Sequence, residues 1–135
     1  MFGFFKRRKH SLPKFPSDVA PTFKALCEDL PVERVKELEP EVDRCLERFQ
    51  ELAEKYPHMN LTLANKIGER SKMLLAKYED LSKEHRRLVI GAVRYFAVAE
   101  DSLSETTFAA GFHDDARVIN YVLEELGMSD LCLAL

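Results

Sequence analysis

The sequence is poor in the residues that build turns. Its 135 residues include no tryptophan, five glycines and six prolines, while glutamate, lysine, leucine and alanine are frequent. Glycine and proline punctuate the many turns of β folds, whereas the frequent residues here favour helices. The composition therefore predicts an all-α protein, and the length suits one domain with a hydrophobic core of its own.

Cysteine and long apolar stretches are also scarce. Cys27, Cys45 and Cys132 are widely spaced and form no C-x-x-C pair, so we expect reduced packing residues of a cytoplasmic protein. The longest apolar stretch, residues 88–99, is interrupted by Arg94 and is shorter than the roughly 20 residues of a membrane span. No signal peptide is expected, because the apolar N-terminal residues precede the basic ones.

Charge is unevenly distributed along the chain. Residues 1–17 contain five basic residues and no acid, whereas the remainder has 15 basic and 23 acidic residues. We expect residues 1–17 to be a disordered basic and aromatic tail, and residues 18–135 to be a single helical domain. An acidic folded body argues against a nucleic-acid partner, whose basic patch should lie on the folded surface.

Apolar residues recur at helical spacing in five stretches of the chain. These stretches are approximately 21–30, 32–56, 60–81, 82–99 and 114–126. A loop is expected over residues 101–111, between the last two stretches. Because each apolar stripe needs a partner to be buried, the pattern predicts a compact bundle of about five helices.

Several residues predict where the helices begin and end. Pro40 predicts a break near Glu39-Pro40, because proline in a helix interior removes a hydrogen bond and clashes with the preceding turn. Asn60 is a candidate N-cap of the third stretch, Ser82 is expected to start the fourth, and Gly127 is placed to end the last helix. The leucine-rich stretch over residues 131–135 is expected to pack back on the bundle.

One part of the chain carries an ordered pattern of aromatic, acidic and small residues. In order, the pattern is Tyr95-Phe96, Asp101, Gly111-Phe112, Asp114-Asp115 and Ala116. In these residues the stretch from about 86 to 119 resembles the YkvA-like family, a bacterial family of small helical domains of unknown function. The family's loop is usually apolar, rich in proline and near a membrane, whereas residues 102–110 here contain no proline. The resemblance implies a bacterial helical domain but no particular activity.

Four residues around the expected loop form a candidate metal site: Asp101, His113, Asp114 and Asp115. Several carboxylate oxygens are what a hard divalent cation binds, and the His-Asp pair, with His85 upstream, is similar to the HD-type metal phosphohydrolases. The alternative is structural. Asp114 and Asp115 would then lie in the first turn of the last helix and stabilise its N-terminus, with Asp101 capping the loop.

The N-terminal tail offers a second candidate site, for a membrane or a partner. Its residues are Phe4, Phe5, Lys6, Arg7, Arg8 and Lys9. Aromatic side chains insert at the level of lipid headgroups, and basic side chains attract anionic lipid. The alternative is a disordered terminus with a chance run of basic residues.

Two hypotheses for function remain open at this point. The first is a non-enzymatic helical interaction module that binds a protein partner and acts at the inner membrane surface, because no nucleophile and base occur at a convincing spacing. The second is a metal-dependent hydrolase of the HD type that uses His113, Asp114 and Asp115 with a divalent cation. Neither hypothesis calls for a cofactor other than that cation.

Overall fold

A computed structural model describes residues 19–98 and 105–134, and all regular structure in these ranges is helical. The helices are α1 (Val19–Leu26), α2 (Val32–Val35), α3 (Leu38–Ala53), α4 (Leu61–Ala76), α5 (Lys83–Val98) and α6 (Glu105–Glu125). Two short 3-10 helices, η3 (Tyr78–Asp80) and η5 (Ser129–Leu131), follow α4 and α6. The predicted all-α bundle of about five helices is confirmed. Within the described ranges, no helix is both long and apolar enough to cross a membrane.

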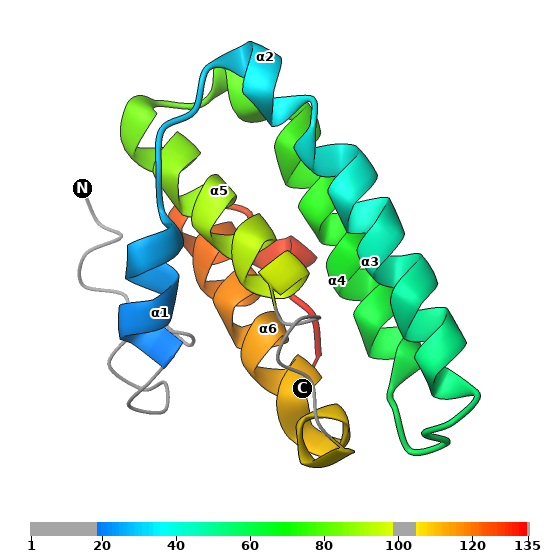
Figure 1. The fold of residues 1–135 in the computed structure, drawn as a ribbon. Helices are drawn as coiled ribbons and strands as arrows, with labels where there is room; N and C mark the ends of the chain where they lie inside the picture. The colour runs from blue at the N-terminus through cyan, green and yellow to red at the C-terminus, as the bar shows by residue number, and fades with distance from the viewer. Residues whose placement is uncertain (1–18, 99–104, 135) are drawn as a thin grey trace.

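Helix α5 lies at the centre of the bundle. It contacts α1 on one side, α3 and α4 on the other, and α6 behind it (Figure 1). Helices α3 and α4 run antiparallel as a hairpin, and the one-turn α2 precedes α3 at the end of the bundle where α4 finishes (Figure 1). The chain thus brings the start of α3 beside the end of α4.

Aromatic rings from three helices form the centre of the core. The ring of Phe112 on α6 lies 4.9 Å from that of Phe49 on α3 and 6.5 Å from that of Phe96 on α5, between ring centroids. All three side chains are buried. Ring pairs of this kind add about 0.5–1.5 kcal/mol each beyond the burial of apolar area. This cluster joins the first half of α6 to α3 and α5.

The predicted cap at Asn60 and the helix end at Gly127 are confirmed, and the helix expected to start at Ser82 begins at Lys83 with Ser82 as its cap. The Asn60 side chain accepts a hydrogen bond from the backbone N–H of Leu63 at 3.0 Å, and the Ser82 hydroxyl accepts one from His85 at 3.2 Å. Gly127 follows α6 with a φ of 77°, and the backbone N–H of Met128 binds the carbonyl of Leu123. A left-handed residue with this hydrogen bond is the Schellman ending that glycine favours.

Two predicted boundaries differ from the structure near prolines. The first helix begins at Val19 and ends at Leu26, so its expected span of about 21–30 is wrong by several residues. The break near Glu39-Pro40 exists, but it lies earlier, between Val35 and Leu38. Pro40 is in the first turn of α3. Backbone N–H groups in this turn make no hydrogen bond within the helix, so proline is tolerated there.

The largest correction concerns the expected loop over residues 101–111. Helix α6 already begins at Glu105, so the predicted start near Asp114 is wrong. Gly111 was interpreted as the end of the loop but is inside the helix. Glycine in a helix interior costs about 1 kcal/mol relative to alanine, which the burial of Phe112 and the following apolar residues outweighs.

The non-helical segments beside the bundle are held by buried polar side chains. The Tyr78 hydroxyl donates to the carbonyl of Leu30 at 2.7 Å and accepts from its N–H at 2.9 Å, which fixes the α1–α2 connection. At the C-terminus, Leu133 is buried and Arg70 donates to the carbonyl of Leu131. The predicted packing of this leucine-rich end is thus confirmed for the described residues. All three cysteines are free.

Candidate functional site

The predicted metal-site residues on α6 lie in its third turn. His113, Asp114 and Asp115 are eight or more residues after the start of the helix at Glu105. The interpretation of the two aspartates as residues of the first turn is therefore wrong, because the unpaired N–H groups and the positive end of the helix dipole belong to that turn alone. Stabilisation of a helix N-terminus therefore does not account for the aspartate at position 115.

The three side chains do not point to one place. The His113 side chain is exposed, that of Asp114 is half-buried, and Asp115 is 4% exposed. Residues two apart in a helix point about 200° away from each other, so His113 faces solvent while Asp115 faces the core. Across the described ranges, no group of three histidine, cysteine, aspartate or glutamate side chains could hold a metal ion. Asp101 lies outside those ranges.

Asp115 is a carboxylic acid inside an apolar core. Its Oδ1 atom is buried and has no hydrogen-bond partner among the protein atoms that the structure describes. Burial raises the pKa of this carboxyl group well above its ordinary range, and the neighbouring Asp114 carboxylate raises it further. The sequence held a signal for this burial, since Asp115 follows Phe112 by three residues and precedes Ile119 by four, on the apolar stripe.

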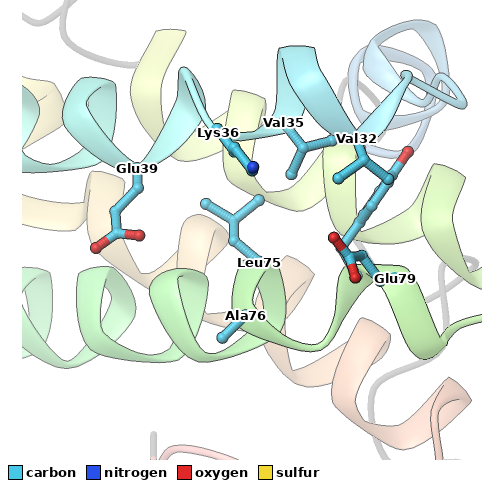
Figure 2. Close-up of a pocket in the computed structure, with 8 residues that line it drawn as sticks. Val32, Val35, Lys36, Glu39, Leu75, Ala76 and Glu79 are labelled. Atoms are coloured by element: carbon cyan, nitrogen blue, oxygen red, sulfur yellow. The ribbon is translucent and has the colours of Figure 1, made fainter.

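A pocket of about 210 Å³ opens between the α2–α3 segment and the end of α4 (Figure 2). Val35 and Leu75 are buried in its floor and Val32 is half-buried. Three charged side chains surround this floor, and Figure 2 shows Glu39 at one end, Glu79 at the other and Lys36 between them. The pocket combines an apolar floor with a charged rim of both signs.

A second pocket, of about 310 Å³, lies on a different face of the same α2–α3 segment. Its apolar lining residues are Leu26, Leu30, Leu38 and Ala97, and its charged ones are Arg34, Glu37, Glu41 and Arg94. The guanidinium of Arg94 is paired with Glu28 at 2.7 Å. Neither pocket has a local sequence signal, because residues far apart in the chain line each one.

The N-terminal candidate residues Phe4, Phe5, Lys6, Arg7, Arg8 and Lys9 lie outside the described ranges. Comparison of the chain with models of known protein families, with curated proteins and with solved structures finds no match.

Proposed function

We propose that this chain is a non-enzymatic helical interaction module, which binds a partner protein at the pocket between α2 and α4. The observation that supports this proposal is the pocket itself, which has an apolar floor of Val32, Val35 and Leu75 within a charged rim. A partner would insert one apolar side chain there. Burying a valine- or leucine-sized side chain stabilises a complex by about 1.5–3 kcal/mol.

The rim would select among apolar partners. Lys36, Glu39 and Glu79 form no ion pair with any other residue that the structure describes. Glu39 also interacts electrostatically with Lys72, but none of the three charges is held in an ion pair, so all three can attract groups that flank the inserted side chain. Charges at the edge of an interface contribute more to specificity and association rate than to affinity. We therefore expect a partner with an apolar anchor next to both a basic and an acidic residue.

Selection of peptides from a random display library against the full chain tests the proposal. Ala76 is exposed at the end of α4 and lines the pocket, so Ala76→Arg fills the entrance without touching the core. Arginine in the last turn of a helix also suits the helix dipole. Ala25→Arg is the matched control, because Ala25 is likewise exposed in the last turn of its helix but lines neither pocket.

The selected peptides should bind Ala76→Arg at least about tenfold more weakly than wild type, and Ala25→Arg as tightly as wild type. Peptides that bind all three proteins equally would contradict the proposed site. Hydrolysis of phosphoesters with added Mn²⁺ or Mg²⁺, abolished by Asp114→Asn, would contradict the non-enzymatic part of the proposal and favour the HD-type hydrolase.

Membership of the YkvA-like family is part of the same proposal. It is supported by the order and spacing of Tyr95-Phe96, Asp101, Gly111-Phe112 and Asp114-Asp115. The family implies a helical domain and brings no activity that would conflict with a binding role.

The proposal includes a contact between the N-terminal segment and an anionic membrane surface. It is supported by the sequence Phe4-Phe5-Lys6-Arg7-Arg8-Lys9, which joins aromatic to basic side chains. Flotation with phosphatidylserine-containing vesicles should recover the full chain but not a variant without residues 1–14. Vesicles of phosphatidylcholine alone are the control for charge, and equal recovery of both proteins with anionic vesicles would exclude the contact.

A further inference from the structure

The first half of α6, residues 105–116, contains a buried group that disfavours its docked position. Asp115 is 4% exposed, and its Oδ1 atom has no hydrogen-bond partner in the described part of the chain. An unpartnered polar atom in the core loses its hydration without a replacement, and a charged one loses more. Separation of this half of the helix from the core would restore that hydration.

The buried residues of α4 and α5, two helices that contact α6, offer Asp115 no compensation. The buried residues of α4 are apolar or glycine apart from Ser71, whose hydroxyl is itself unpartnered. Those of α5 are Val89, Ile90, Gly91, Ala92, Val93 and Phe96. The carboxylate of Asp114 acts on Asp115 by repulsion and disfavours its ionised form. No buried base on these two helices is available to pair with Asp115.

The second half of α6, residues 117–125, is anchored much more firmly. The Asn120 side chain is fully buried and makes two hydrogen bonds with the backbone of Leu133. Arg70 of α4 binds the carbonyl of Leu131, so the segment after α6 is also tied to α4. One helix therefore has a half that is fixed by polar contacts and a half that contains an unsatisfied acid.

We propose that Asp115 makes residues 105–116 a segment that opens locally, separating Phe112 from Phe49 and Phe96 while residues 117–125 remain docked. Opening hydrates the Asp115 carboxyl group and uncovers the apolar faces of the aromatic cluster. This inference is independent of the proposed function, because neither pocket involves α6. Local opening with part of the fold intact is a common source of native-state exchange.

Native-state hydrogen exchange of the full chain tests the proposal. The measured quantity is the protection factor of each amide, which already corrects for the intrinsic exchange rate. In wild type, amides of residues 112–116 should be at least about tenfold less protected than those of residues 119–123. Asp115→Leu removes the unsatisfied group and should raise protection of residues 112–116 about tenfold, without a matching change in residues 119–123.

Two further variants keep the test decisive. Asp115→Ala also removes the unpartnered carboxyl group and is smaller than aspartate, so it should raise the same protection factors even if leucine is too large for the site. Asp80→Asn removes an exposed carboxylate from η3 and should leave α6 unchanged. Equal protection along the whole of α6 in wild type, or no gain from either Asp115 variant, would overturn the proposal.

Discussion

The side chain of Asn120 binds both backbone groups of Leu133. The backbone N–H of Leu133 donates to Oδ1 of Asn120 at 2.7 Å, and Nδ2 of Asn120 donates to the Leu133 carbonyl at 3.0 Å. Tyr78 does the same for Leu30 through a single hydroxyl group. Both leucines are buried and lie outside the α-helices, so helical hydrogen bonds cannot satisfy their backbone N–H and carbonyl groups. One polar residue thus fixes each irregular segment.

Replacement of Asn120 by leucine should destabilise the fold strongly. Both the N–H and the carbonyl of Leu133 would be left buried without these partners, and we expect a loss of about 2–4 kcal/mol in the free energy of unfolding. Urea denaturation monitored by circular dichroism measures it. The matched control is Asn65→Leu, at an exposed position of α4, which should change stability by less than about 0.5 kcal/mol. Similar small losses for the two variants would contradict the role given to Asn120.

Tyr78→Phe removes one oxygen atom and should cost about 1–3 kcal/mol, because the backbone of Leu30 loses both of its bonds to this hydroxyl. The effect should be local. The amide of Leu30 should exchange much faster. Amides in the middle of α4 should exchange faster only to the extent that the global stability falls. An unchanged Leu30 amide would show that another group holds the α1–α2 connection.

Two helical glycines should respond oppositely to alanine. A Cβ atom at Gly91 would lie 2.8 Å from the buried ring of Phe23 and 2.4 Å from the Cys27 sulfur, so Gly91→Ala should lose about 1–3 kcal/mol despite its better helix propensity. At Gly68 the close atoms all belong to the end of the half-buried Leu46 side chain, with the two methyl groups at 2.6 and 2.9 Å and Cγ at 3.1 Å, and this side chain can rotate away. Gly68→Ala should therefore range from neutral to about 1 kcal/mol more stable.

Thermal unfolding of the two variants, side by side, measures this difference, and each serves as the control for the other. Equal losses would mean that Leu46 is as firmly fixed as Phe23. A gain at Gly91 would mean that α1 can shift away from α5 at little cost.

Local signals in the sequence predicted the fold class, the cap at Asn60 and the start of a helix near Ser82, because capping and apolar stripes act over a few residues. The start of α6 was not predictable in this way. Gly111 is an unfavourable residue for a helix, and only the tertiary contacts of Phe112 with Phe49 and Phe96 reveal why the helix continues through it. Because α6 begins at Glu105, Asp114 and Asp115 cannot be explained as residues that stabilise the start of a helix. The two pockets depend on how α2 meets α4, α1 and α5, which no local pattern contains.

The buried carboxyl group of Asp115 should make stability depend on pH in a defined direction. Its pKa is raised well above 3.8 in the folded protein, so between 3.8 and the folded value the folded state binds more protons than the unfolded state. The contribution of Asp115 to stability is therefore fully present below about pH 4 and is lost as pH rises through the folded pKa. Asp115→Asn cannot ionise and should escape this loss.

The difference in unfolding free energy between Asp115→Asn and wild type should be constant below about pH 4 and should then shift in favour of the variant as pH rises to 8. Urea denaturation of both proteins across this range measures it, and other titrating groups cancel in the difference. Asp114→Asn, with Asp115 retained, should reduce the dependence, because the Asp114 carboxylate adds to the pKa shift. A difference that stays constant from pH 4 to 8 would mean that Asp115 ionises as readily in the folded as in the unfolded chain, and that water reaches it within the core.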